Sequence, residues 1–455
     1  MSTVPNDPYF PSQWALQNTG QTVGGVTGTP GADINAPEAW DFGHGSPDVV
    51  VADIGTGVDY SNSDLAANMW SAPFAYSINI GGVQYNCPAG SHGFSVGAVG
   101  TQAGCNGQET DAYGHDTAVA GIIGAIGNNS SEVAGVNWTT SIMSIRVTDQ
   151  YAQFNGSDVV NGVAALSRIA VATGASVWAA NISLSVSNDL DALRDEMTAA
   201  SGVLFAASTG DDCANGARAP ASFYLANELS VAASDQLDQW AYWSGTQCSN
   251  TGGDVAAPGK NVYTTIIGST TPGLFNGTSA STPFVAGAIA LLRATCPLPL
   301  PALKATIEGT ADTKAALTQI ATSGRRLNLG AALASCISGT AGTASITVRV
   351  YTNPSDPDTG SIYATIDGQT ASVSYDTSQD TTDSVGENLA QMISGVTDVT
   401  AVYNGGGQIS LTTSALGPYT GYTLSTGVNN DCGEPPNDCG RQPTITNSSF
   451  VAGHN

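Results

Sequence analysis

The sequence is poor in charged residues, and above all in positive charge. Only 11% of its 455 residues are charged, whereas about 25% is usual for soluble domains. Twelve Lys and Arg stand against 37 Asp and Glu, so the formal net charge is −25. Binding to nucleic acid, or to an anionic membrane surface, needs a surplus of Lys and Arg. The composition therefore predicts that neither is a partner of this chain.

Long apolar runs and metal-type cysteine spacings are also missing. No apolar run approaches the roughly 18 residues of a membrane-spanning helix, and residues 1–10 lack the basic and apolar regions of a signal peptide. The eight cysteines show no CxxC or Cys/His spacing, which argues for disulfides rather than zinc. Disulfides imply an oxidising, extracellular setting for a secreted protein. The simplest connectivity joins neighbours, as 87–105, 213–248, 296–336 and 432–439.

Residues 1–338 are predicted to form one α/β domain. Apolar runs bounded by Gly and Asp alternate with helical segments rich in small residues, which is typical of βαβ units and a parallel sheet. The runs are continuously apolar, as expected of strands that are covered on both faces. They lie at residues 49–52, 141–147, 177–184, 203–207 and 229–233, and the helical segments lie at 117–126, 157–172, 189–200, 283–294 and 301–310.

The composition changes after Cys336. Residues 337–344 form a plausible linker, and residues 345–428 are predicted to form a small α+β module. Its strands are expected at 345–351, 361–366, 371–375, 399–403 and 408–412, with one amphipathic helix over 383–393. Residues 429–455 are rich in Pro, Asn and Gly, and we expect an irregular tail that is stapled by a 432–439 disulfide.

Ser279 is the first candidate for chemistry. It lies in the stretch 275–287, FNGTSASTPFVAG, where a Gly-Thr-Ser turn precedes an apolar helix predicted to start at Pro283. Unpaired N–H groups and the positive end of the helix dipole favour negative charge at such a position. A serine there is a candidate nucleophile if a base can reach it, although a lone serine is more often only a helix cap.

Three other stretches have to be considered together with the serine turn. They are VVVADIGTGVDY at 49–60, DAYGHDTAVAG at 111–121 and AASTGDD at 206–212. With residues 275–287 they resemble, in the same order, the four signature blocks of the subtilisin-like serine proteases. The resemblance covers about residues 1–335 and implies a mostly parallel central sheet flanked by helices. It also implies peptide or protein substrates, Ser279 as the nucleophile and His115 as the general base.

The acid that orients the histidine departs from the family pattern. Gly55 stands where the family has this aspartate. Asp53 lies two residues earlier, on the same face of a strand and about 6.6 Å away, so a shifted register would bring it to His115. Asp116, next to the histidine, is the second candidate for the missing carboxylate. The sequence leaves both open.

The group that stabilises the oxyanion departs as well. Asp211 stands where the family has an asparagine that donates its side-chain amide to the oxyanion. An ionised carboxylate has no proton to donate and repels an oxyanion, whereas a protonated one can donate. Sedolisins and one prohormone convertase resemble this chain in using aspartate there. Activity is therefore expected to favour acidic conditions.

Two other sites follow from the sequence. Asp7 and Asp64 match positions that resemble a calcium site near the N-terminus of relatives, and carboxylate oxygens suit this cation. Two solvated surface carboxylates are the alternative. Arg325 and Arg326 are expected to be a solvated pair at a helix end rather than a substrate clamp.

Three hypotheses remain for the function. The first is a secreted endopeptidase using Ser279 and His115, with Asp53 or Asp116 as the third group. The second is a pseudoprotease that binds peptide without cutting it, and the third is a structural protein that self-assembles. Losing the orienting aspartate costs about 10⁴ in turnover, and losing an oxyanion donor costs about 10²–10³. We therefore expect weak activity at neutral pH, which the pair Gly55→Asp and Asp211→Asn should raise.

Overall fold

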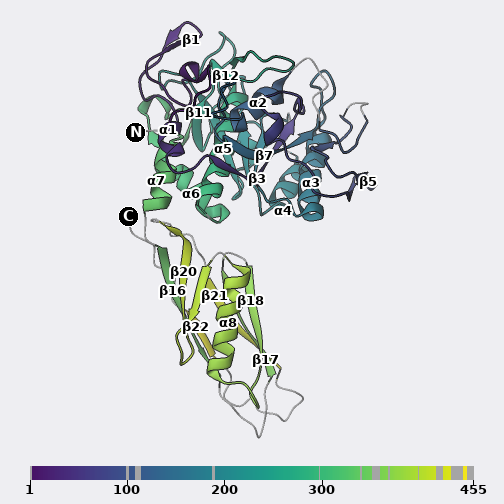
Figure 1. Cartoon of the computed structure of the whole chain (residues 1–455), viewed down its shortest axis with the longest axis vertical. Coiled ribbons are helices and arrows are strands. Elements are labelled where there is room, and N and C mark those ends of the chain that lie inside the picture. The colour runs from purple at the N-terminus through teal and green to yellow at the C-terminus, as the bar shows by residue number, and fades with distance from the viewer. Residues whose placement is uncertain are drawn as a thin grey trace. The chain divides into compact units, whose positions relative to one another are not determined.

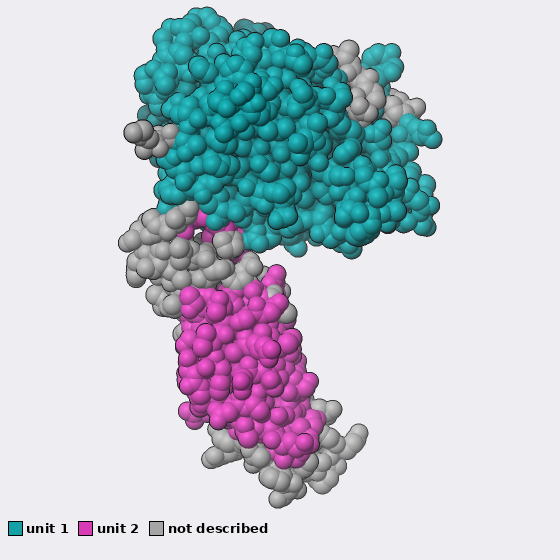
Figure 2. Space-filling model, viewed as in Figure 1, with its two compact units in different colours: residues 1–295, 303–334 teal, residues 296–302, 335–455 magenta. Residues whose placement is uncertain are grey.

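A computed structural model describes most of the chain, in two compact units. One unit comprises residues 1–295 and 303–334, and the other comprises 296–302 and 335–455 (Figures 1 and 2). The described residues are 3–98, 102–107, 114–186, 190–296, 298–338, 341–350, 359–366, 369–397, 399–416, 424–431 and 444–447.

The larger unit is built on a nine-stranded sheet. The strand order is β14-β15-β11-β10-β9-β8-β3-β7-β6, and every neighbouring pair is parallel except β14–β15. The predicted α/β fold with a mostly parallel sheet is thus confirmed. The strands are β3 (Gly45–Gly55), β6 (Gly93–Ser95), β7 (Thr139–Arg146), β8 (Val177–Ile182), β9 (Leu204–Ser208), β10 (Glu228–Ser234), β11 (Val255–Pro258), β14 (Asp312–Thr313) and β15 (Arg325–Arg326).

Helices cover this sheet. Helix α5 contacts β3, β8, β9, β10 and β11 as well as α2, whereas α3 contacts β3, β7 and α4 (Figure 1). The helices are α1 (Ala36–Trp40), α2 (His115–Gly124), α3 (Gly156–Thr173), α4 (Asp191–Ala199), α5 (Thr278–Thr295), α6 (Leu300–Thr310) and α7 (Leu329–Ser338). Three two-stranded sheets accompany them: β1 (Thr22–Val23) with β2 (Val26–Thr27), β4 (Tyr76–Ile80) with β5 (Val83–Cys87), and β12 (Val262–Thr264) with β13 (Gly273–Phe275).

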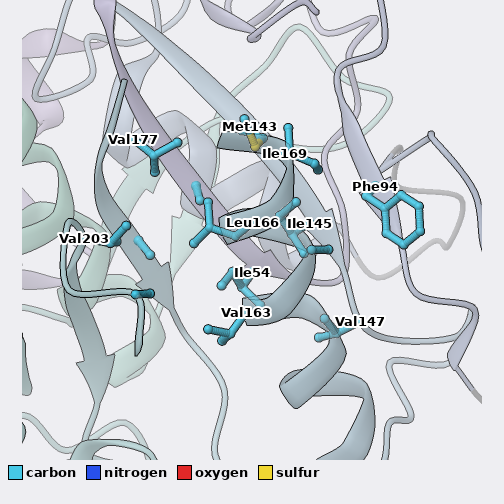
Figure 3. Close-up of a cluster of buried hydrophobic side chains, with 14 of the residues drawn as sticks. Ile54, Phe94, Met143, Ile145, Val147, Val163, Leu166, Ile169, Val177 and Val203 are labelled. Carbon is cyan, nitrogen blue, oxygen red and sulfur yellow. The ribbon is translucent and has the colours of Figure 1, made fainter. Parts of the chain in front are cut away.

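The core between the sheet and α3 decides which way the side chains of β3 point. Ile54 belongs to this core, with Ile145 of β7 and Val163 and Leu166 of α3 (Figure 3). A Cβ atom at Gly162 of α3 would lie 3.4 Å from the Ile54 side chain. Since successive strand residues point to opposite faces, the two neighbours of Ile54 face the side of the sheet away from α3.

The smaller unit combines one helix with two antiparallel sheets. Their orders are β19-β20-β16-β22 and β18-β17-β21, and α8 contacts β18 and β19. The elements are β16 (Ala341–Arg349), β17 (Thr359–Ile366), β18 (Gln369–Asp376), α8 (Thr382–Val396), β19 (Val399–Tyr403), β20 (Gln408–Leu416), β21 (Leu424–Asp431) and β22 (Thr444–Asn447). The tail was expected to be irregular, but β22 lies within it and pairs with β16. This pairing joins segments about 100 residues apart, which the composition of the tail cannot reveal.

Three of the four predicted disulfides are present. They join Cys87 to Cys105, Cys213 to Cys248 and Cys296 to Cys336. The predicted 432–439 pair lies outside the described residues. Within the described part of the chain, no single helix is long and apolar enough to cross a membrane. The bent pair α5 and α6 meets that test by length and composition alone.

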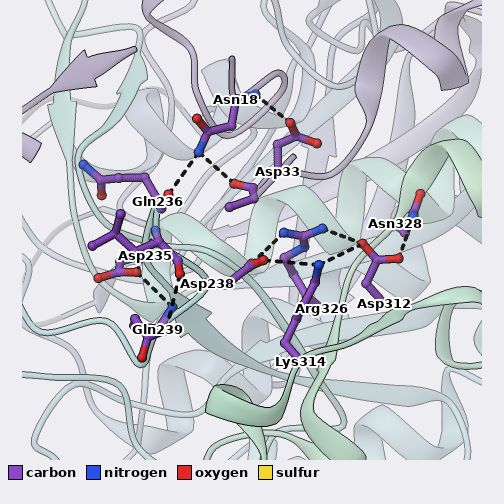
Figure 4. Close-up of polar contacts among 12 residues, drawn as sticks. Asn18, Asp33, Asp235, Gln236, Asp238, Gln239, Asp312, Lys314, Arg326 and Asn328 are labelled. Atoms are coloured by element: carbon purple, nitrogen blue, oxygen red, sulfur yellow. Dashed lines mark hydrogen bonds and ion pairs between the residues drawn. The ribbon is translucent and has the colours of Figure 1, made fainter. Parts of the chain in front are cut away.

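Arg326 is buried, contrary to the expectation of a solvated pair. It belongs to β15 and is 1% exposed. Its guanidinium donates to Asp238 and Asp312, with both N···O distances 2.5 Å, and Lys314 lies 3.3 Å from Asp238 (Figure 4). The sequence predicted both arginines at a helix end, whereas in the structure they form β15, whose pairing with β11 and β14 buries Arg326.

Replacing Arg326 with alanine is expected to destabilise the larger unit by about 3–5 kcal/mol. The substitution removes a fully buried side chain and its two charged hydrogen bonds, and it leaves Lys314 as the partner of both carboxylates. Arg325→Ala is the matched control, and we expect it to cost about 0–1 kcal/mol because that side chain is partly exposed. Chemical denaturation followed by circular dichroism measures both. Equal losses in the two variants would contradict this account.

Candidate active site

The candidate residues gather where parallel strands end. Asp53 and Gly55 close β3, and Asn181 and Ile182 close the neighbouring strand β8, which Ser183 follows. Helix α2 begins at His115 and α5 begins at Thr278, and these two helices contact each other. In open parallel sheets, ligands bind outside the carboxyl ends of the strands, so the topology alone makes this edge the candidate site.

His115 is held by the residue that follows it. Its Nδ1 lies 2.7 Å from Oδ1 of Asp116. The Asp116 side chain is 1% exposed, and the Asp116 backbone N–H donates to Thr56 Oγ1 at 3.0 Å. The His115 ring meets Phe275 edge to face, with centroids 5.3 Å apart. A carboxylate on Nδ1 fixes the tautomer that keeps Nε2 unprotonated, which a general base requires.

The Asp116 carboxylate occupies the space that Gly55 leaves open. A Cβ atom at Gly55 would lie 2.3 Å from Oδ2 and 2.6 Å from Oδ1 of Asp116. Gly55 and Asp116 both depart from the family pattern, and together they amount to one change. The carboxylate reaches the same space from α2 instead of from β3. Of the two acids that the sequence left open, Asp116 is the one bonded to the imidazole.

Asp53 lies nearby but has another partner. It is fully buried, and its Oδ1 accepts a hydrogen bond from Nδ2 of Asn181 at 3.0 Å, across the β3–β8 pairing. Burial raises the pKa of Asp53 well above its usual value, and the negative charge of Asp116 raises it further. Asp53 and Asp116 therefore share one poorly solvated region.

Ser279 lies in the first turn of α5. The helix begins at Thr278, five residues before the predicted start at Pro283. Ser279 Oγ donates to the Ser183 carbonyl at 3.0 Å, and Ser183 Oγ donates to the Ser279 carbonyl at 3.1 Å. Pro283 has no N–H for that second carbonyl, which is four residues earlier, so the hydroxyl of Ser183 takes the place of the helical donor.

Two cavities open beside these residues. Ser279 and Asp211 line the larger one, of about 610 Å³, and His115 and Asp116 line the smaller one, of about 150 Å³. Ser183 and the following Leu184 line both. The serine and the imidazole thus flank one strand end. The sequence analysis did not predict that Ser183 donates to the Ser279 carbonyl. The signal for it was Pro283, which leaves this carbonyl without its helical N–H donor.

Asp211 accepts hydrogen bonds from the start of α5. Its Oδ1 accepts from Thr278 N at 2.8 Å and from Thr278 Oγ1 at 2.7 Å. Burial raises the pKa of Asp211, while His115 opposes the rise. The next residue, Asp212, is half exposed and pairs with Arg218, whose hydrogen bond lowers the pKa of Asp212. The two neighbouring carboxyls therefore differ: burial raises the pKa of Asp211, whereas the Arg218 hydrogen bond lowers the pKa of Asp212.

Asp7 and Asp64 lie apart from this site and are buried, at 2% and 0% exposure, so the solvated alternative is wrong. Asp7 Oδ2 accepts from Asn128 N at 2.7 Å. Asp64 accepts from Asn129 Nδ2 at 2.7 Å and from Val133 N at 3.1 Å. Burial raises the pKa of Asp64 from 3.8 to about 6. Within the described ranges, no group of three or more His, Cys, Asp or Glu side chains converges as a metal site.

Comparisons with known proteins agree with the fold. A model described as the subtilase family of peptidases matches residues 46–352. Thermitase of Thermoactinomyces vulgaris is 32% identical over 312 residues, covering 68% of this chain and 92% of that protein. An extracellular protease of Xanthomonas campestris pv. campestris is 30% identical over 315 residues, covering 65% and 50%. The chain therefore belongs to the subtilase family of serine proteases.

A solved structure gives independent support for the fold. A protease of Pseudoalteromonas arctica PAMC 21717 superposes with a TM-score of 0.58 at 23% identity. The match covers 73% of this chain and 99% of that one. At this identity the likeness concerns the fold alone.

Proposed function

We propose that this chain is a serine endopeptidase in which Asp116 replaces the orienting aspartate of the family. Ser279 is the nucleophile, His115 the general base, and Asp116 holds the imidazole. The observation that carries the proposal is the 2.7 Å contact between His115 Nδ1 and Asp116 Oδ1, made in the space of the missing Gly55 side chain. Membership of the family supports peptide or protein substrates.

The chemistry follows the roles of these groups. Ser279 Oγ leaves the Ser183 carbonyl, gives its proton to His115 Nε2 and attacks the scissile carbonyl carbon. Backbone N–H groups at the start of α5 favour the negative charge that develops on the carbonyl oxygen. Protonated Asp211 donates to the same oxygen. The imidazolium then protonates the leaving amine, and water hydrolyses the acyl-enzyme by the reverse sequence.

Labelling by a fluorophosphonate probe, together with a casein assay at pH 4 and pH 8, tests the proposal. We expect labelling and turnover in the wild-type chain, and neither in Ser279→Ala, because the probe needs an activated serine. Mass spectrometry of the labelled peptide identifies the residue. Absence of labelling at both pH values would reject the proposal that this chain is a serine endopeptidase.

A peptide-binding pseudoprotease is the second candidate. It is favoured by the Ser279 hydroxyl, which donates to the Ser183 carbonyl, and by the carboxyl at Asp211. Such a protein would bind a peptide without labelling or turnover, which calorimetry with an uncleaved peptide aldehyde can measure. Self-assembly of the chain remains a third possibility, to be tested by sedimentation at several concentrations.

We propose a secreted, extracellular protein. The three disulfides suit an oxidising compartment, and one relative bears the name extracellular protease. Fractionation of the producing cells tests this, and recovery of the chain only from the cytosol would contradict it.

We propose that Asp7 and Asp64 contribute to a structural calcium site. Both carboxylates engage residues 128–133, and Glu132 of that segment is 4% exposed with Oε2 lacking a hydrogen-bond partner among the described residues. The negative charges of Glu132 and Asp7 act on Asp64, and a bound calcium ion, which prefers carboxylate and carbonyl oxygens, would offset them.

Calcium is expected to raise the melting temperature, and more so above pH 6. Because the folded state raises the pKa of Asp64 from 3.8 to about 6, it binds this proton more tightly than the unfolded chain does. In EDTA, this group therefore makes stability fall as the pH rises from about 4 to about 6. Differential scanning fluorimetry with EDTA or calcium, in wild type and Asp64→Asn, measures this. An equal response of both proteins would refute the site.

A further inference from the structure

Asp53 is a buried acid that the proposed mechanism does not use. It is 0% exposed, and only its Oδ1 has a hydrogen bond, from Asn181 at 3.0 Å. Its Oδ2 is buried and lacks a hydrogen-bond partner among the described residues. An ionised carboxylate with an unsatisfied oxygen is costly in such a place, so this acid needs an explanation.

The geometry of β3 directs the Asp53 side chain toward Asp116. Ile54 packs in the core against α3, so Asp53 and Gly55 both point to the other face of the sheet. The Asp116 carboxylate fills the space beside Gly55, the next position along that face. Asn181 of β8 and Ser144 of β7 are the register partners of Asp53 on either side.

Few charges surround this pair of acids. From α2, the Asp116 carboxylate lies beside Gly55, and its Oδ1 contacts Nδ1 of His115. The strands on either side contribute Asn181 and Ser144, which carry no charge, and Arg146, the register partner of Gly55, whose Nε donates to the Thr148 carbonyl. Two carboxyls that share a poorly solvated site resist double ionisation, because their like charges repel at close range.

We propose that Asp53 is a positioning residue, which stays protonated and donates its Oδ2–H to the carboxylate of Asp116. The pair then carries one negative charge, held by Asp116 against His115. Asn181 keeps the Asp53 carboxyl in place by donating to Oδ1. The catalytic meaning of this pair rests on the proposed function, whereas its protonation does not.

The charge state of Asp53 can be measured through the titration of His115, without an activity assay. The chain has four histidines, so ¹⁵N-histidine labelling with His115→Gln for assignment gives the titration midpoint of this ring. In Asp53→Asn, which keeps a donor and carries no charge, we expect the midpoint to shift by less than about 0.3 pH units. A fall of about one unit or more would mean that the wild-type Asp53 is ionised, and would overturn the proposal.

The kcat values of two variants separate the effect of the hydrogen-bond donor of Asp53 from the effect of its side-chain shape. Asp53→Leu keeps the shape but has no donor, and we expect kcat to fall about 10–100-fold with little change in KM, as for a lost hydrogen bond to a charged group. Asp53→Asn should lie within about threefold of wild type. Equal kcat in the two variants, at equal melting temperatures, would overturn the proposal. If wild type cleaves nothing, the proposed function fails, and the His115 titration still decides the state of Asp53.

Discussion

Replacing Asp116 with asparagine is expected to lower kcat by about 10⁴. The 2.7 Å contact of the carboxylate with His115 Nδ1 would be lost, and an amide in its place favours the wrong tautomer of the imidazole, as it does in serine proteases of other folds. Steady-state hydrolysis of a peptide anilide measures the loss. A decrease below about tenfold would mean that another group orients His115.

The space around Gly55 supplies a control for this result. A side chain at position 55 would begin 2.3 Å from Asp116 Oδ2, so Gly55→Asp alone is expected to displace the Asp116 carboxylate and reduce activity. The gain expected from the sequence for Gly55→Asp therefore has to be revised. Only the double change Gly55→Asp with Asp116→Gly, which moves the acid back to β3, should restore turnover. If Gly55→Asp alone improves kcat, Asp116 is not the orienting acid.

Asp211→Asn should raise kcat about 10²–10³-fold at pH 8. Oδ1 of the new amide can still accept from Thr278, as Asp211 Oδ1 does at 2.7 and 2.8 Å, while its N–H₂ becomes available to an oxyanion. Burial raises the pKa of Asp211, so the wild-type donor is present at low pH and is lost as the pH rises. The advantage of the variant should therefore shrink toward pH 4.

The adjacent acid is the matched control for this prediction. Asp212→Asn makes the same chemical change at the next residue, but the Asp212 side chain is half exposed and paired with Arg218. Asp212→Asn is expected to change kcat by less than about threefold, since a surface ion pair contributes little. A pH-independent gain for Asp211→Asn, or an equal gain for Asp212→Asn, would exclude the role of a protonated Asp211.

The predictions that depended on order along the chain agree well with the structure. Alternating apolar and helical segments predicted the parallel sheet, and the neighbour rule predicted three disulfides that the structure contains. The four signature blocks predicted the family that the comparisons support. Each of these properties is encoded locally, in periodicity, spacing or short motifs.

The predictions that failed depended on contacts between distant segments. Arg326 was expected in solvent and is buried between Asp238 and Asp312, because β15 pairs with β14 and β11. The start of α5 was predicted at Pro283, where the apolar segment follows the Gly-Thr-Ser turn. In the structure the hydroxyl of Ser183, which follows β8, replaces the donor that proline lacks, and the helix extends back to Thr278.

The sequence by itself determined that this chain is a subtilase with a serine, a histidine and no acid at the customary position. It could name two replacements but could not choose between them, since strand spacing says nothing about which side chain fills the space beside a glycine. In the tertiary structure Asp116 is the acid that contacts His115, because β3 and α2 meet where the side chain of residue 55 is missing. Close packing leaves room for one carboxylate there, and Nδ1 of His115 contacts it.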